Sequence, residues 1–344
     1  MYLKFYQLRE EPFCLTPDPR FFHLAQPYRD ALGEIVQSIL RRKGILVLTG
    51  PIGTGKTTLL HAAMRVLESS KEKSIPLASA FVLNPLLTRE EFLETLMQEY
   101  EVPFAPASKP ARLAALHKMF LEKQQQGGTS LLIVDEAHLL TPDLLEEIRL
   151  LNNTDTYREK LLQVVLCGQP ELSLLLQRRE MRALQQRITQ YCSLRALTLP
   201  ETRGYVAERL HAAGLKGPAP FPPTAIEVVH RFSHGIPRLI NQVCDVALEL
   251  GFASRRECVQ QDVVQEAAMQ LHLTEEAPIE LLAPLEPPAH AHIPMEQAAL
   301  HRVGSGVRTE PREVPAYPGE VAAVQTAVDL IIDAMRHRRA TVPE

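Results

Sequence analysis

Eight residues, Gly50-Pro-Ile-Gly-Thr-Gly-Lys-Thr57, constrain what this chain can fold into more than any other part of its sequence. They match the G-x-x-x-x-G-K-[ST] pattern at every fixed position. The apolar run 45–49 comes directly before them and predicts a buried strand, and the helical pattern 58–65 follows. A glycine-rich loop in this context predicts a phosphate-binding loop, because its backbone N–H groups can surround an anion at the start of the helix.

Two positions of this loop have specific predicted tasks. Lys56 is placed to reach the β- and γ-phosphates, and the hydroxyl of Thr57 to bind Mg²⁺. ATP and Mg²⁺ are therefore the expected cofactors. The predicted nucleotide contacts comprise the whole loop and the residue after it: Gly50, Pro51, Ile52, Gly53, Thr54, Gly55, Lys56, Thr57 and Thr58.

A second apolar run, 131–134, ends in the two carboxylates Asp135 and Glu136. Ligands of open α/β sheets collect at the C-terminal ends of the strands. We predict that Asp135 holds Mg²⁺, directly or through water, and that Glu136 polarises the water that attacks the γ-phosphate. The alternative is that both acids cap the helix expected from Pro142. His138 follows on the same turn, and we expect it to be solvated.

Two further side chains end apolar runs and are candidates for sensing the nucleotide. Gln169 ends the run 161–168 and can contact the γ-phosphate or the attacking water. Asn84 ends the run 78–83 and can form a hydrogen bond with Glu136. Each can equally be a simple cap at the end of a strand.

Arginines are the third group of candidates, because cationic side chains stabilise phosphoryl transfer. Arg187 lies on the expected last helix of the α/β region, and a neighbouring subunit can present such a residue to the nucleotide. Arg238 begins a helix in the sequence Gly235-Ile-Pro-Arg, where Pro237 suits the first turn.

From Gly44 to Leu199, short apolar runs alternate with amphipathic segments, which predicts an α/β fold whose parallel sheet is covered by helices on both faces. Strands are expected at 45–49, 78–83, 130–135, 161–167 and 192–199, and helices at 56–69, 89–99, 111–125, 142–151 and 180–190. Four amphipathic segments then predict a small all-helical domain: 201–213, 224–233, 237–250 and 259–271.

Beyond these segments the composition changes, and prolines recur at positions 278, 284, 287, 288, 294, 311, 315 and 318. Such a stretch predicts a disordered linker. An amphipathic helix follows, whose apolar stripe needs a partner surface. The expected organisation is an N-terminal extension (1–42), the α/β domain (43–199), the helical lid (200–273), the linker (274–320) and a docking helix (321–339).

Composition limits the partners and the cellular compartment expected for this chain. The chain of 344 residues carries 41 acidic and 37 basic side chains, and this net charge of −4 gives no support for nucleic-acid binding. No run approaches the ~18–20 apolar residues of a membrane span, and the N-terminus lacks the pattern of a signal peptide. The five cysteines are widely spaced, which indicates reduced thiols in a cytoplasmic protein rather than disulfides or a zinc site.

Several segments, in this order along the chain, resemble the AAA+ ATPases of the general secretion pathway protein A family. This family is akin to the ATPases that regulate transposition and, more distantly, to origin-recognition ATPases. The resemblance covers about residues 1–272. The segments that carry it are Pro12-Phe13, Pro17–Phe22, Leu48–Thr58, Leu132–His138, Val165–Leu172 and Gly235–Asn241.

The resemblance implies an AAA+ core of the ASCE P-loop NTPase type with a helical lid, nucleotide between the two, and a homo-oligomeric ring or filament. It implies that four residues bind and hydrolyse the nucleotide: Lys56, Thr57, Asp135 and Glu136. It also implies that Gln169 is the first sensor, Arg238 the second sensor and Arg187 a candidate arginine finger. The aromatic residues Phe21, Phe22 and Tyr28 are expected near the nucleotide base.

Three functions follow as hypotheses. The first is an ATPase that drives assembly or operation of a bacterial envelope export apparatus for secretion, pili or exopolysaccharide, with the helix 321–339 docked on a partner such as an inner-membrane component. The protein would then be cytoplasmic and at most peripheral to the membrane. The family member carries a membrane span and a peptidoglycan-binding domain after its ATPase, and neither is expected here. The alternatives are a DNA-associated ATPase of the transposition-regulator type and a nucleotide-gated scaffold with little turnover.

Overall fold

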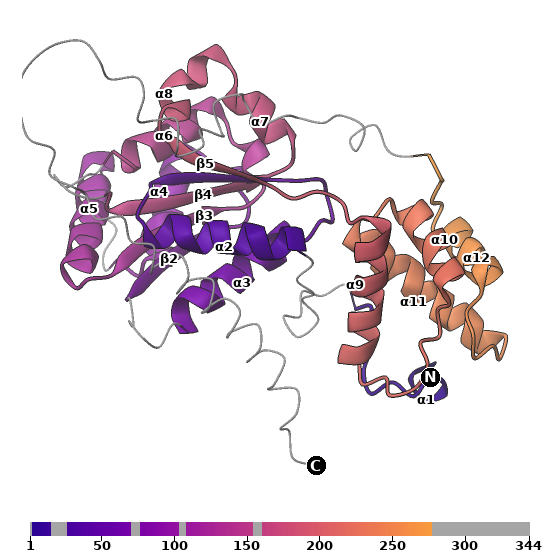
Figure 1. Ribbon diagram of the computed structural model, residues 1–344. Coiled ribbons are helices and arrows are strands. Elements are labelled where there is room, and N and C mark those ends of the chain that lie inside the picture. The colour runs from indigo at the N-terminus through magenta and orange to yellow at the C-terminus, as the bar shows by residue number, and fades with distance from the viewer. Residues whose placement is uncertain (1, 15–25, 70–75, 103–107, 154–159, 277–344) are drawn as a thin grey trace, which may run out of the picture.

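A sheet of five parallel strands forms the centre of the larger lobe of the molecule (Figure 1). In the computed structural model, the described residues are 2–14, 26–69, 76–102, 108–153 and 160–276. The strand order is β2-β3-β4-β1-β5. The strands are β1 (Ile45–Thr49), β2 (Leu77–Val82), β3 (Thr129–Val134), β4 (Leu162–Gly168) and β5 (Ile188–Ser193).

Helices cover both faces of this sheet, which explains why β3 and β4 are buried along their whole length (Figure 1). Alternate strand residues point to opposite faces. Leu46 and Leu48 of β1 therefore pack with α2 (Gln26–Leu40) and α3 (Lys56–Ser69). Ile45 and Val47 pack into the core on the other face. The helices there are α4 (Arg89–Glu99), α5 (Lys109–Gln125), α6 (Pro142–Leu151), α7 (Glu171–Leu176) and α8 (Arg182–Gln185), with the short 3₁₀ turns η2 (Ala137–Leu139) and η3 (Arg179–Met181).

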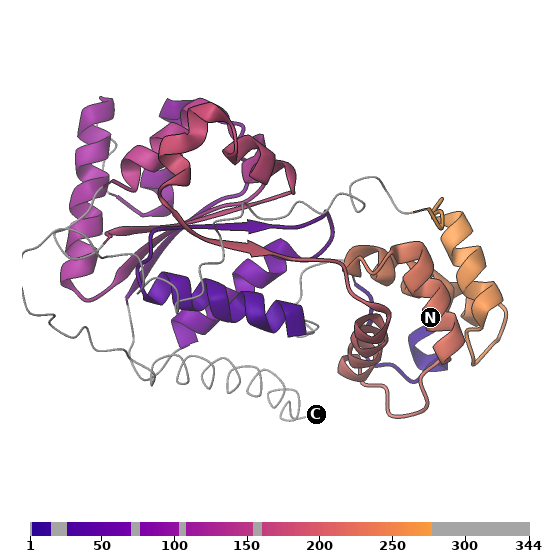
Figure 2. The same cartoon turned by 45° about the horizontal axis from the view of Figure 1, so that its top comes forward.

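The smaller lobe is entirely helical in the described residues, and β5 leads directly into it (Figures 1 and 2). The N-terminal segment packs on this lobe rather than on the sheet: the hydroxyl of Tyr2 donates to Asp245 at 2.7 Å, and buried Arg209 donates to the carbonyl of Cys14 at 3.1 Å. The helices of this lobe are α1 (Tyr2–Phe5), α9 (Leu199–Ala212), α10 (Pro223–Ser233), α11 (Pro237–Ala253) and α12 (Gln261–Gln270).

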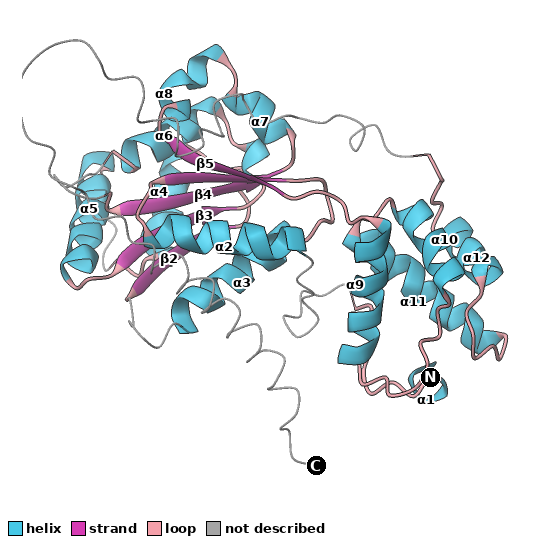
Figure 3. Ribbon diagram, viewed as in Figure 1, coloured by secondary structure: helices cyan, strands magenta, loops and turns pink. Residues whose placement is uncertain are grey.

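The sequence-based prediction of the last strand and the helix before it is wrong (Figure 3). The expected strand 192–199 is in fact β5 at 188–193, and the expected helix 180–190 shrinks to η3 and α8. The segment Ile188–Ser193 includes the strand-favouring residues Ile188, Thr189 and Tyr191, and it pairs in parallel with β1. Local propensity and strand pairing therefore agree at this edge of the sheet, and the error was to extend the expected helix 180–190 over the first residues of β5.

The predicted linker and docking helix lie almost wholly outside the described residues, since only 274–276 are described. Of the helices in the described ranges, none has the length and apolar character needed to cross a bilayer.

The start of α9 carries an ionic cap that predicts acid sensitivity. The carboxylate of Glu201 accepts hydrogen bonds from both terminal nitrogens of Arg195, at 2.7 and 2.8 Å, and from the backbone N–H of Thr198 at 2.7 Å. These interactions, Arg195 first, lower the pKa of Glu201 from 4.5 to about 2. Because folding favours the ionised form, its stabilisation is complete above pH 4.5 and disappears as the pH falls toward 2.

We expect Glu201→Gln to lower the free energy of unfolding by about 1–2 kcal/mol at pH 7, and the difference from the parent to shrink at pH 3. Urea unfolding at both pH values measures this. Glu227→Gln, which removes an exposed pair with Arg203, is the matched control and should change stability less. Equal differences at pH 7 and pH 3 would contradict the assignment.

Candidate functional site

The loop between β1 and α3 has the backbone conformation of an anion cradle. Gly53 and Gly55 adopt φ values of 79° and 86°, in the left-handed region that favours glycine. A Cβ atom on Gly53 would also lie 2.9 Å from Cβ of Arg238, in the smaller lobe. This glycine is therefore required both by the turn and by the close approach of the second lobe.

Lys56 lies inside this cradle. Its side chain is buried, and Nζ donates to the carbonyls of Gly50 at 2.8 Å and Pro51 at 3.0 Å. Burial lowers the pKa of Lys56, while the nearby carboxylates Glu136 and Asp135 act in the opposite direction. The ammonium group is thus positioned beside the loop's backbone N–H groups, where an anionic ligand would meet both.

The two predicted metal ligands lie side by side. The hydroxyl of Thr57, at the start of α3, donates to Oδ2 of Asp135 at 2.7 Å, just beyond the end of β3. These are hard oxygen donors, and Mg²⁺ in nucleotide sites uses one or two protein oxygens together with water and phosphate. The pair fits Mg²⁺ in this respect. Among the described residues there is no cluster of three or more His, Cys, Asp or Glu that could hold a metal ion by itself.

Glu136 follows in an unusual conformation. Its φ and ψ are 49° and 35°, in the left-handed region that non-glycine residues rarely adopt. Atom Oε2 is buried and accepts no hydrogen bond from the described residues. Rare backbone conformations and unpaired buried polar atoms are concentrated at functional sites.

The structure corrects one expectation about the surroundings of Glu136 and decides between two alternatives for another. His138 is not solvated, since its side chain is 11% exposed and its Nδ1 lies 3.4 Å from Oε2 of Glu136. Of the two alternatives for Asn84, the structure has the local cap at the strand end and not the hydrogen bond with Glu136. Asn84 is exposed, and its Oδ1 accepts from the backbone N–H of Leu86 at 3.2 Å, as in a local turn after β2.

Gln169 lies one residue beyond β4, the strand between β3 and β1. The sheet order therefore places it between the acidic end of β3 and the phosphate-binding loop that follows β1. Its backbone N–H donates to Nδ1 of His138 at 3.5 Å. Sequence reasoning missed this contact because a hydrogen bond between two loop ends leaves no periodic pattern.

The two predicted arginines lie at opposite ends of the sheet. The backbone N–H of Arg238, at the start of α11, donates to the carbonyl of Gly53 at 3.2 Å, and the side chain of Arg238 is exposed. Arg187 lies in the turn before β5 and not on a helix, which corrects the expectation. Since Ile188 pairs with Ile45 at the start of β1, Arg187 is separated from its own loop by the length of that strand, roughly 16 Å.

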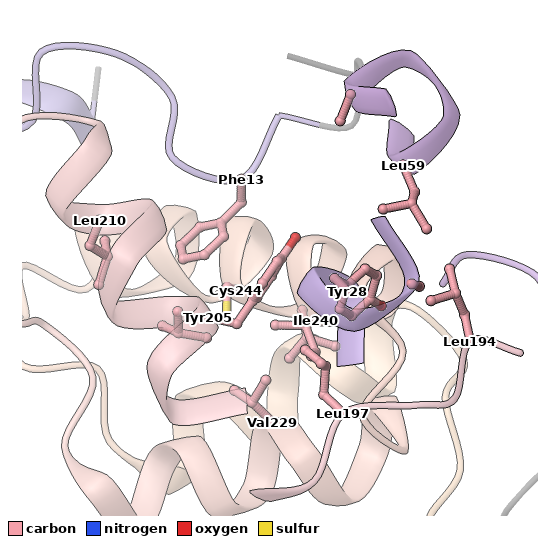
Figure 4. Packing of buried hydrophobic residues seen from close by; sticks show 14 of the residues in the cluster. Phe13, Tyr28, Leu59, Leu194, Leu197, Tyr205, Leu210, Val229, Ile240 and Cys244 are labelled. Carbon is pink, nitrogen blue, oxygen red and sulfur yellow. The ribbon is translucent and has the colours of Figure 1, made fainter. Parts of the chain in front are cut away.

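Tyr28 connects α2 to the loop, a contact that no local sequence pattern indicates. Its hydroxyl donates to the carbonyl of Thr54 at 2.7 Å, and burial raises the pKa of Tyr28. Its ring belongs to a hydrophobic cluster that also contains Leu194 and Ile240, so this cluster joins the sheet lobe to the helical lobe (Figure 4). The related prediction for residues 21 and 22 lies outside the described residues.

Comparisons with known proteins agree with this architecture. Residues 39–176 match the family model described as an AAA domain. The chain is 38% identical to general secretion pathway protein A of Aeromonas hydrophila over 257 residues, which are 74% of this chain and 45% of that protein. The chain thus spans less than half the length of this relative.

Two solved structures show the same fold at low sequence identity. The Drosophila origin recognition complex bound to DNA aligns with a TM-score of 0.60 and 20% identity, over 78% of this chain and 66% of that one. The Aeropyrum pernix ORC2 protein, in ADPNP-ADP complexes, aligns with a TM-score of 0.58 and 18% identity, over 76% of this chain and 71% of that one. At such identities the likeness establishes the fold alone.

Proposed function

Because this chain is an AAA+ protein related to general secretion pathway protein A, we propose that it hydrolyses ATP to ADP and phosphate with Mg²⁺ as cofactor. One observation carries the proposal most directly. The hydrogen bond between Thr57 and Asp135 joins the phosphate-binding loop to the acidic end of β3, beside the buried ammonium of Lys56. The AAA+ fold itself implies nucleotide binding with a divalent metal.

The chain's own residues account for each task in this reaction. Lys56 and the loop N–H groups bind the phosphate oxygens, and Thr57 and Asp135 would hold Mg²⁺, which neutralises phosphate charge. Glu136 orients the attacking water and accepts its proton. Gln169, at the end of β4, would contact the γ-phosphate, and Arg238 would contact it from the point where the helical lobe meets the loop.

Phosphate release by the purified full chain tests this proposal. We expect ATP-dependent release in the presence of Mg²⁺ and its loss when EDTA removes the metal. Nucleotide binding without release above the buffer control, by folded protein, would instead support a nucleotide-gated scaffold.

Arg238 gives a test of whether a side chain of the helical lobe contacts the nucleotide. We expect Arg238→Ala to weaken ATP binding by about ten-fold, the size expected when one charge-assisted hydrogen bond to a phosphate is lost. Titration with a non-hydrolysable ATP analogue measures the affinity. Arg231→Ala is the matched control, because that arginine lies on α10 and pairs with Glu275 instead. Equal affinities of the two variants would contradict the assigned role.

For assembly, we propose that identical subunits form a ring or filament in which Arg187 acts on a neighbour's nucleotide. Its separation from its own loop along β5 supports a role in trans. Sedimentation of the chain with and without the ATP analogue tests this, and a monomer under both conditions would contradict it.

For the biological process, we propose that ATP turnover drives assembly or operation of an envelope export apparatus from the cytoplasmic side. Support comes from the relationship to general secretion pathway protein A. The segment 321–339 would dock on a protein partner, such as an inner-membrane component. Deleting residues 321–344 should abolish partner capture and leave phosphate release intact, and unchanged capture would refute the docking.

A DNA-associated function is the second candidate. The chain shares its fold with an origin recognition complex that was solved bound to DNA. A gel shift with duplex DNA and the ATP analogue at low salt separates the two. Retention that weakens steeply with salt would support DNA binding, whereas the net charge of −4 leads us to expect none.

A further inference from the structure

The contacts around Glu136 point to a residue that the proposed reaction does not yet use. His138 lies on η2, the 3₁₀ turn directly after Glu136, and its side chain is 11% exposed. The turn packs closely on the end of β4, where a Cβ atom on Gly168 would lie 3.1 Å from the backbone N of His138. The imidazole is therefore held between the ends of β3 and β4.

A single nitrogen of this ring has two neighbours. Nδ1 of His138 lies 3.5 Å from the backbone N of Gln169 and 3.4 Å from Oε2 of Glu136. A ring nitrogen either offers a lone pair or carries a hydrogen, so it cannot serve both neighbours at once. With the lone pair it accepts the N–H of Gln169. With the hydrogen it donates to the carboxylate of Glu136.

The heavy-atom geometry satisfies hydrogen-bond criteria for the first of these two arrangements. The N–H of Gln169 donates to Nδ1, and Oε2 of Glu136 is buried without a hydrogen bond. A buried carboxylate oxygen without a hydrogen bond is destabilised, and a donor would stabilise it. Nδ1 of His138 lies 3.4 Å from this oxygen. If Nδ1 carries the hydrogen and changes its partner from Gln169 to Glu136, it supplies that hydrogen bond.

We propose that His138 is a positioning residue that connects Gln169 to Glu136. The inference rests on the proposed ATP hydrolysis. When Nδ1 donates to Oε2, the carboxylate is fixed and its other oxygen is left to orient the attacking water. When Nδ1 accepts from Gln169, the carboxylate is unfixed. A small displacement of Gln169 at the end of β4 therefore changes whether Glu136 is held ready for hydrolysis.

Steady-state ATP hydrolysis by the full chain tests this inference. We expect His138→Ala to lower kcat by about ten-fold, as when one hydrogen bond to a charged group is lost, and to leave the affinity for a non-hydrolysable ATP analogue unchanged. His138→Asn should recover most of kcat, because its amide nitrogen can donate to Glu136. His117→Ala, on the exposed face of α5, is the matched control and should behave as the parent.

A double variant makes the test specific to Glu136. If His138 acts through this carboxylate, adding His138→Ala to Glu136→Gln should cause no further loss of kcat. Losses that multiply in full, an unchanged kcat in His138→Ala, or a parallel fall in kcat and melting temperature that His138→Asn does not restore would each overturn the inference. Absence of hydrolysis in the parent chain would refute the proposed function itself, which is a distinguishable result.

Discussion

Replacing Lys56 by alanine is expected to reduce ATP hydrolysis by at least about 100-fold and to weaken ATP binding as well. The ammonium group is buried in the phosphate-binding loop and is held within 3.0 Å of two loop carbonyls. Of the eight loop residues 50–57, Lys56 alone carries a positive charge, so the loop itself offers no substitute for it at the β- and γ-phosphates. Loss of a preorganised charge in a water-poor site costs two or more orders of magnitude in rate.

The control for this variant is Lys118→Ala on α5, which removes an exposed lysine whose partner is Glu122 at 3.8 Å. Phosphate release and titration with the ATP analogue should distinguish the two variants, while their melting temperatures show that both are folded. If Lys56→Ala binds and turns over ATP as well as the parent does, the assignment of the nucleotide site is wrong.

Glu136→Gln is expected to separate binding from hydrolysis. The amide has nearly the same shape but cannot accept a proton, so we expect kcat to fall by about 10²- to 10³-fold while ATP affinity is retained. The left-handed backbone at this position is equally accessible to both residues, since they differ only at the end of the side chain. Single-turnover phosphate release and analogue titration measure the two quantities separately.

Glu146→Gln on α6 is the matched control, because it removes a carboxylate that pairs with Arg149 outside the site. Its rate should equal that of the parent within error. An unchanged rate in Glu136→Gln would remove this residue from the reaction and support the scaffold hypothesis.

The sequence predicted the strand–loop–helix unit around the nucleotide site closely. The helices 56–69, 89–99 and 142–151 begin and end where expected. For the last two, a threonine side chain caps the first turn, Thr88 in one and Thr141 in the other. The edge strand β5 was misplaced, because the expected helix 180–190 was extended over its first residues, although Ile188, Thr189 and Tyr191 favour a strand.

For the site, the sequence determined which residues meet at the phosphate loop. The fixed spacing of strand, loop and helix places Lys56 and Thr57 at the C-terminal end of β1. Because the strands are parallel, Asp135 at the end of β3 lies at the same edge of the sheet. These placements depend on local geometry and sheet direction, both of which leave a readable pattern.

Only the tertiary structure decided how the polar side chains of separate loops meet. It turned Asn84 away from Glu136, brought His138 between Glu136 and Gln169, and placed Arg238 against Gly53. These residues are close in space because whole helices and strands pack together. Their distances depend on ångström-scale positions of loop ends, which no periodicity in the sequence encodes.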